Sequence, residues 1–177
     1  MEAAVEVASN LRTDDYREVW EGHGHFPRWY IPFAAFNGDT VYFNVPNGKT
    51  AGLAGVQEGG KIWMLCTPAI HDYPLTFARE AKRFIESREE KLLWNIVDKR
   101  NTAHLKLLKF LGFKFLRELE HGPNKLTFIE FCRVRTSNSR NNHEMGLAVE
   151  LDDRGVKRYN ELVGEMRSRS MTEQDFI

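Results

Sequence analysis

The sequence predicts an α+β domain whose mixed, mostly antiparallel sheet is flanked by helices, with a C-terminal helical tail. Short runs of β-branched and aromatic residues, separated by turn residues, occupy residues 40–66 and 92–134. Two other stretches repeat apolar residues at helical spacing. The chain of 177 residues is long enough to bury one sizeable core. We therefore expect a domain over residues 1–135, a polar linker over 136–142 and a tail over 143–177.

The first elements are read from local spacing. Valines and glutamates over residues 2–8 predict a first strand, and Tyr16, Val19 and Trp20 predict a helix over residues 13–21. Residues 22–33 are rich in glycine, proline and aromatic side chains, so we expect an ordered loop there.

Three short runs follow, at residues 40–45, 50–56 and 61–66. The turn residues Asn47-Gly48 and Gly59-Gly60 separate them, which is typical of antiparallel strands joined by hairpins. A helix is then expected over residues 75–89, because Pro74 suits its first position and apolar residues recur along one face.

The clearest local pattern spans residues 92–118. An apolar run of strand length is followed by Asn101, whose side-chain oxygen can cap a helix, and Gly112 ends that helix where a positive φ is needed. A final pair of strands is expected at 113–118 and 124–134, around the turn at His121-Gly122-Pro123. The predicted order is β, α, three β, α, β, α, β, β.

Composition excludes few partners. The chain has 25 basic and 25 acidic residues, so its net charge gives no footprint for nucleic acid or membrane binding. No signal peptide and no apolar segment of spanning length is recognisable, and we expect the protein to stay where it is made. Cys66 and Cys132 lie in apolar runs and are expected as buried free thiols. His23 and His25 lack further ligands nearby, so no metal site is expected.

Asn101, a short amphipathic helix and Gly112-Phe113 together resemble the closing motif of GNAT-type acyltransferases. The wider pattern resembles the internal virion protein family of T-seven-like podophages over about residues 40–134; its matching residues are Leu93-Trp94-Asn95, Val97, Asn101, His104, Leu108-Lys109, Gly112 and Phe115. This resemblance implies a GNAT-like domain in a phage virion or morphogenesis protein. It also implies portal, core or tail proteins as partners, and a virion location after synthesis in the host cytoplasm.

The GNAT resemblance implies an acyl-CoA cradle of glycines at a helix start, where backbone N–H groups hold pyrophosphate. Residues 67–74 contain no glycine but two prolines and Asp72, and Leu108 stands where many of these enzymes have a proton-donating tyrosine. We therefore predict that acyl transfer is lost, with no catalytic residue and no cofactor.

The alternative is an acyl-CoA-dependent N-acetyltransferase. Acetyl-CoA would then be held by Leu65, Cys66, Thr67, Asn101 and His104. Simpler roles exist for two of these residues, because Asn101 can be only a helix cap and His104 only a packed helix residue.

In the virion protein hypothesis, aromatic and apolar side chains provide a possible interaction surface. Its residues are Phe26, Trp29, Tyr30, Phe33, Tyr159, Leu162 and Met166. Aromatic side chains often anchor interfaces, but the first four could also pack beneath a loop, and the last three could dock a tail helix on the domain.

Overall fold

The computed structural model describes residues 2–135, and residues 1–133 form one compact unit. The linker and tail expected from the sequence, including Tyr159, Leu162 and Met166, lie outside the described residues. The helices are α1 (Glu2–Ser9), α2 (Thr13–Arg17) with its π-helical continuation η1 (Glu18–Gly22), α3 (Pro27–Phe36), α4 (Pro74–Ser87) and α5 (Thr102–Phe110). Short 3₁₀ turns are η2 (Glu58–Gly60) and η3 (Pro68–Asp72). The strands are β1 (Asp39–Asn44), β2 (Thr50–Gln57), β3 (Lys61–Cys66), β4 (Leu92–Asp98), β5 (Lys114–His121) and β6 (Leu126–Val134).

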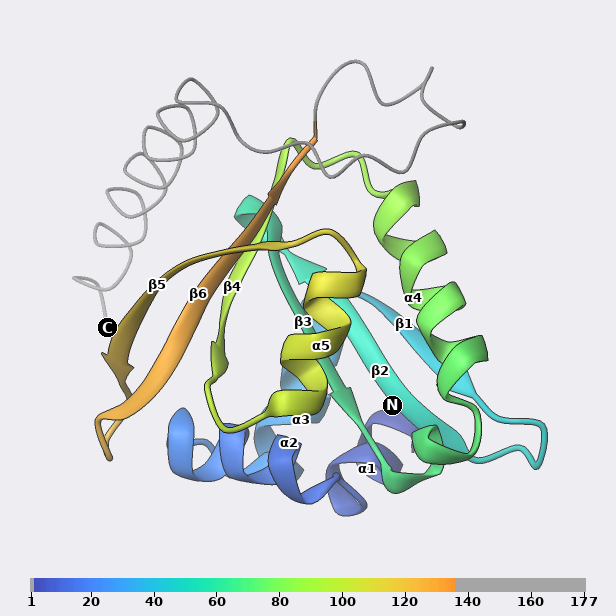
Figure 1. Cartoon of the computed structure of the whole chain (residues 1–177). Coiled ribbons are helices and arrows are strands. Elements are labelled where there is room, and N and C mark those ends of the chain that lie inside the picture. Colours follow the sequence, from blue (N-terminus) through green and yellow to red (C-terminus); the bar gives the residue numbers. More distant parts are fainter. Residues whose placement is uncertain (1, 136–177) are drawn as a thin grey trace. The chain divides into compact units, whose positions relative to one another are not determined.

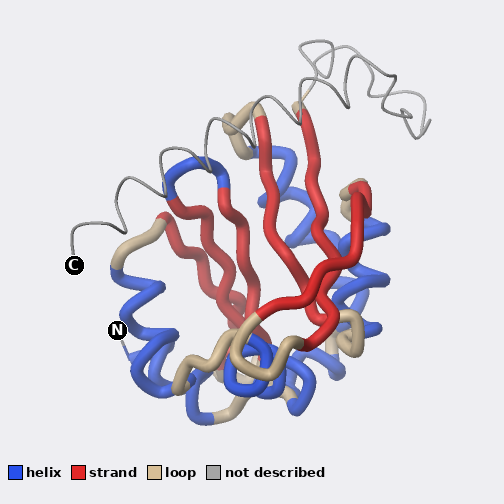
Figure 2. Tube along the Cα trace, turned by 90° about the vertical axis from the view of Figure 1, so that its left-hand side faces the viewer, coloured by secondary structure: helices blue, strands red, loops and turns tan. Residues whose placement is uncertain are grey.

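The six strands form one mixed sheet in the order β1-β2-β3-β4-β6-β5, which confirms the predicted fold class (Figures 1 and 2). β1 to β3 are an antiparallel meander, β5 and β6 are an antiparallel hairpin, and β3 and β4 are parallel. The parallel pair requires a crossover, which α4 supplies.

Helices cover both faces of the sheet. On one face α4 and α5 bury Ile85 and Leu108 against Val97 and Phe131. On the other, α1 and α3 pack Val7 and Ile31 against Leu53 and Leu65. Because side chains alternate along a strand, β2 and β3 contribute to both cores.

The strand predicted over residues 2–8 is wrong, because this segment is helix α1. Ala4, Val7 and Ala8 are its buried residues, and their spacing of three and four places them on one helical face. Alanine and glutamate are also strong helix formers, and this outweighs the strand preference of the two valines.

The ordered loop predicted over residues 22–33 is also wrong over its second half, where the chain forms α3. Pro27 occupies the start of this helix, where proline has no N–H to lose. Pro32 lies inside the helix. Burial of Ile31 and Ala34 against the core therefore outweighs the hydrogen bond that Pro32 removes.

The remaining elements follow the sequence pattern. Asn101 caps α5 by accepting a hydrogen bond from the His104 N–H at 3.3 Å, and Gly112 has the expected positive φ of 81°. Cys66 and Cys132 are buried free thiols, as predicted. Among the described residues, no helix has the length and apolar character that crossing a membrane requires.

Candidate functional site

The parallel strands β3 and β4 are in register only at Lys61 and Trp94, near their first residues. Two side chains fasten the strands there: Trp94 Nε1 donates to the Gly59 carbonyl at 3.1 Å, and Asn95 Nδ2 donates to the Ile62 carbonyl at 2.7 Å. Beyond this point the strands diverge toward their carboxyl ends (Figure 1). The backbone edge of β3 is thereby freed from β4 over its second half.

A cavity of about 180 Å³ lies beside the freed half of β3. Its lining residues are Arg12, Met64, Cys66, Ile70, His71, Pro74, Phe77, Ala78, Ala103, His104 and Leu107. Most of these side chains are apolar, as is usual for a small-molecule site. Leu65, predicted as a cofactor residue, instead packs into the core beneath α1 and α3, because neighbouring strand residues face opposite sides.

Two residues of the cavity wall, His104 and Cys66, have pKa values displaced from the ordinary ones. Burial lowers the pKa of His104 to about 4, so its imidazole is neutral at pH 7. Burial raises the pKa of Cys66, and the nearby Asp15 carboxylate raises it further, so the thiol stays protonated. His104 can therefore form hydrogen bonds in the cavity, whereas Cys66 is no ready nucleophile.

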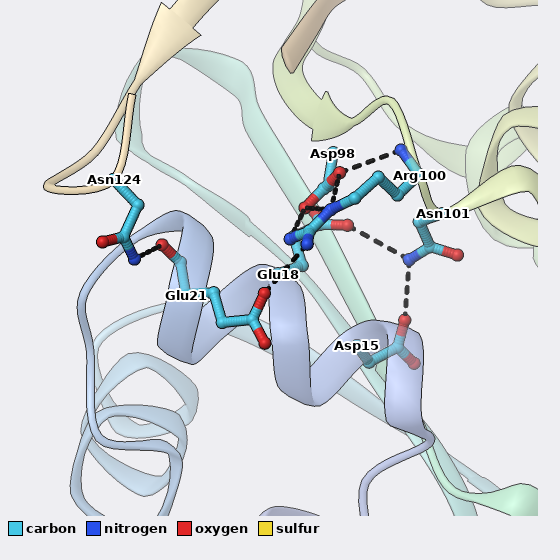
Figure 3. Close-up of polar contacts among 7 residues, drawn as sticks. All are labelled: Asp15, Glu18, Glu21, Asp98, Arg100, Asn101 and Asn124. Carbon is cyan, nitrogen blue, oxygen red and sulfur yellow. Dashed lines mark hydrogen bonds and ion pairs between the residues drawn. The ribbon is translucent and has the colours of Figure 1, made fainter. Parts of the chain in front are cut away.

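One carboxylate ties the end of β3 to the start of α5. Asp15 accepts a hydrogen bond from the Cys66 N–H at 2.9 Å. It also accepts one from Asn101 Nδ2 at 3.0 Å (Figure 3). Arg12 donates to the same carboxylate twice, at 2.7 and 3.0 Å, and both side chains are buried. This charge-assisted arrangement fixes α2 across the mouth of the opening between the strands.

A second buried carboxyl group, that of Glu18, shares Asn101, whose Nδ2 lies 3.1 Å from Glu18 Oε2 (Figure 3). Burial, and then the charge of Asp15, raise the pKa of Glu18 to about 8. Beside it Asp98 is paired with Arg100 at 2.8 Å, and Arg100 reaches Glu21 at 2.9 Å. The carboxyl ends of β3 and β4 are thus joined through a network of buried acids and two arginines.

The predicted cofactor residues come together in part. Cys66 and His104 line the cavity, and Asn101 belongs to the network beside it. Thr67 is buried and donates its hydroxyl to the Thr50 carbonyl at 3.2 Å. The sequence interpretation missed Arg12, Asp15 and Glu18, although their spacing of three residues places three charged side chains on one face of a helix.

The described residues that were predicted as an interaction surface differ in their exposure to solvent. Phe26, Trp29 and Phe33 are exposed, whereas Tyr30 is half-buried and stacks on His25 with ring centroids 4.0 Å apart. His23 Nδ1 lies 2.9 Å from His121 Nε2, and within residues 2–135 no group of three side chains with metal-ligand chemistry converges.

No protein-family model matches the chain, and no curated protein matches its sequence. Solved structures do match its fold. A GNAT-family acetyltransferase from Bacillus anthracis aligns at a TM-score of 0.56 with 12% identity, over 75% of this chain and 87% of that one. Spermidine N-acetyltransferase from Vibrio cholerae, in complex with CoA and spermine, aligns at 0.53 with 11% identity, over 72% and 87%. An aminoglycoside acetyltransferase in complex with coenzyme A aligns at 0.52 with 14% identity, over 79% and 93%.

The fold is therefore that of the GNAT acetyltransferases. These comparisons give no support to the phage internal virion protein family. The prediction that the chain has no cofactor is contradicted by the comparisons, because two of the three similar structures hold CoA. The sequence argument had rested on the missing glycines, the two prolines and Asp72 of residues 67–74, and on Leu108.

Proposed function

We propose that the chain is an acyl-CoA-dependent N-acyltransferase. The observation that carries this proposal is the divergence of β3 and β4 beside a mostly apolar cavity. Such a cavity suits the slender pantetheine arm, and it keeps water from the thioester. Acyl-CoA supplies an acyl group as a thioester, which an amine can attack. Residues of this chain would have to bind the phosphate groups of CoA and orient the acyl group.

The first turn of α4 fits a phosphate group better than its sequence indicated. Pro74 stands at the first helical position, where its missing N–H would have had no partner inside the helix. The Phe77 N–H donates to the Tyr73 carbonyl at 3.0 Å, while the N–H groups of Leu75 and Thr76 have no intrahelical acceptor. These two donors and the helix dipole support anion binding. Asp72, one residue before the cap, opposes it.

His104 is the titratable side chain that α5 contributes to the cavity wall. Leu108, at the position of the expected proton donor, packs instead into the core beneath α4 and α5. Because His104 is neutral, it carries one N–H that can donate a hydrogen bond to a carbonyl oxygen. We assign it the role of polarising or orienting the acyl group, without proton transfer.

We propose an amine as the acceptor, because the two CoA-bound structures of the same fold are a spermidine and an aminoglycoside acetyltransferase. The comparisons lend no support to the virion role. The portal, core or tail partners and the virion location stay predictions from the sequence resemblance, to be tested by searching purified phage particles for the chain.

Calorimetric titration of the full chain with acetyl-CoA and with CoA tests the proposal. Ala103→Trp adds an indole in the cavity wall and should weaken binding at least tenfold. Lys106→Trp, on the same helix but outside the lining, is the matched control and should bind as the unaltered chain does. Release of free thiol on adding spermidine or an aminoglycoside would then report transfer. A folded chain that binds neither ligand would refute the proposal.

A further inference from the structure

Helix α3 is apolar on two opposite faces. Its inward face buries Pro27, Ile31 and Ala34. Its outward face carries Phe26, Trp29, Phe33 and Phe36, whose spacing of three, four and three residues forms one line along a helix. Arg28 is the one charged residue of the helix. A surface helix normally has a polar outer face, and a helix that is apolar all round is normally buried.

The outward aromatic side chains are well exposed. Trp29 is 78% exposed, Phe36 76% and Phe33 67%. Phe26 extends the line toward η1, where its ring meets that of Trp20 edge to face with centroids 5.8 Å apart. We call these five residues, Trp20, Phe26, Trp29, Phe33 and Phe36, the aromatic stripe.

The exposed area of the aromatic stripe is comparable to the area that each partner buries in a protein interface. With about 150–250 Å² for each aromatic side chain, the five exposed fractions amount to about 470–790 Å². The largest apolar patch of a typical monomer covers roughly 300–600 Å². A stable dimer needs about 800 Å² from each partner, so the stripe supplies more than half of one side of such an interface.

We propose that the aromatic stripe is the contact surface of a homodimer, with the stripe of a second copy packed on it. A two-fold contact brings the same surface together from both subunits, so it tolerates few charges near its axis. Along α3 the stripe meets this condition, since Arg28 is the one charged residue of that helix, and at the η1 end Glu21, which follows Trp20, is paired with Arg100. Aromatic pairs also gain from stacking beyond the area they bury. A membrane is the less suitable partner, because the chain has zero net charge and no excess of basic residues to attract anionic lipid.

The dimer would also support the candidate site. Trp20 lies in η1, the same short helix that carries the buried Glu18. Asp15, which bridges β3 and α5, lies one turn earlier in α2. A second copy packed on Trp20 therefore restrains the segment that closes the carboxyl ends of β3 and β4. The dimer itself does not depend on acyl-CoA binding.

Sedimentation velocity of the full chain over a wide concentration range tests the dimer. The unaltered chain should sediment with twice the monomer mass at micromolar concentration. Trp29→Gln and Phe33→Gln should each weaken self-association at least tenfold. Phe110→Gln, at a 56% exposed phenylalanine of α5, is the matched control and should stay dimeric. Circular dichroism identifies any variant that fails to fold.

A monomeric unaltered chain at high concentration overturns the proposal, and two further measurements show what then covers the stripe. Co-sedimentation of the monomer with vesicles of phosphatidylcholine and phosphatidylserine would assign the stripe to a membrane. The fluorescence of Trp29 is the difference between the spectra of the unaltered chain and of Trp29→Gln. If acrylamide fails to quench this fluorescence in the monomer, the chain's own residues cover the stripe. If the chain is a dimer, dilution should dissociate it, and acrylamide should then quench the Trp29 fluorescence more strongly.

Discussion

At the scale of single residues, Asn101 joins the fold to the candidate site. Its oxygen caps α5, and its amide nitrogen donates to Asp15 and Glu18 while the side chain is 1% exposed. Asn101→Ala removes the cap and one hydrogen-bond donor from each of two buried carboxyl groups, so we expect a loss of about 2–4 kcal/mol in the free energy of unfolding. Urea denaturation measures this loss.

Asn101→Asp separates the two roles of this residue. The aspartate keeps the capping oxygen but replaces the donor with a further acid beside Asp15 and Glu18. At pH 8 this variant should be less stable than Asn101→Ala, and the difference should narrow as the pH falls and the new carboxyl group is protonated. Equal stability of the two variants at pH 8 would show that the added acid costs no more than the retained cap contributes.

Glu18 makes stability depend on pH. Its pKa is about 8 in the folded chain against an ordinary value of 4.5, so between these values the folded state holds a proton that the unfolded state has lost. Raising the pH through this window therefore favours unfolding. Glu18→Gln keeps an acceptor for Asn101 and removes the ionisation, so it should be more stable than the unaltered chain by about 1–2 kcal/mol at pH 8.

The comparison is best made between pH 6.5 and 8. Below that range His104 contributes an opposite slope, because its folded pKa of about 4 lies under the ordinary 6.5 and unfolding takes up a proton. Urea midpoints of both proteins across the window measure the effect. A constant difference between them would mean that Glu18 is already ionised in the folded chain at pH 6.5.

At the scale of elements, the β5–β6 hairpin packs directly on the last residue of η1. Gly122 has a φ of 71°, and a Cβ atom there would overlap the Gly22 carbonyl oxygen. Gly122→Ala must therefore separate the hairpin from η1, at an expected cost of about 2–4 kcal/mol. Gly48 also has a positive φ but open space around it, so Gly48→Ala should cost only about 1 kcal/mol. Thermal unfolding of both variants separates the overlap from the backbone strain that they share.

The first turn of α4 offers an element-scale test of anion binding. Asp72 places a negative charge just before two N–H groups that have no acceptor inside the helix. Asp72→Asn should therefore raise CoA affinity about 2–5-fold at low ionic strength, and the gain should fade as salt screens the charge. Glu86→Gln, near the far end of α4, is the matched control. Equal affinities for Asp72→Asn and the unaltered chain would place the phosphate groups elsewhere.

Periodic elements were predictable from sequence, and elements that depend on tertiary packing were not. β3, α4 and α5 show their spacing and end signals locally. α1 was mistaken for a strand because its valines favour extended structure, although its buried residues follow helical spacing. α3 contains Pro32, which local rules exclude from a helix interior, and only the core contacts of its inner face compensate.

The candidate site was only partly predictable, because its parts meet over long sequence separations. Asn101 and His104 were recognised from the capped helix. Their partners Asp15 and Glu18 lie more than 80 residues earlier and reach Asn101 only when α2 packs on the carboxyl ends of β3 and β4. The opening between β3 and β4 could not be predicted from the sequence of either strand. It follows from a register that ends after the Lys61–Trp94 pair.

At the scale of the whole molecule, stability and self-association should be linked. If the folded chain is a dimer through the aromatic stripe, unfolding releases two chains, and dilution favours the unfolded state by mass action. Each tenfold increase in concentration should stabilise the dimer by about 1.4 kcal/mol, seen as a melting temperature that rises with protein concentration. In Phe33→Gln the melting temperature should be lower and should change less with concentration, while Phe110→Gln should behave as the unaltered chain does. A concentration-independent melting temperature for the unaltered chain would mean that its folded state gains nothing from a second copy.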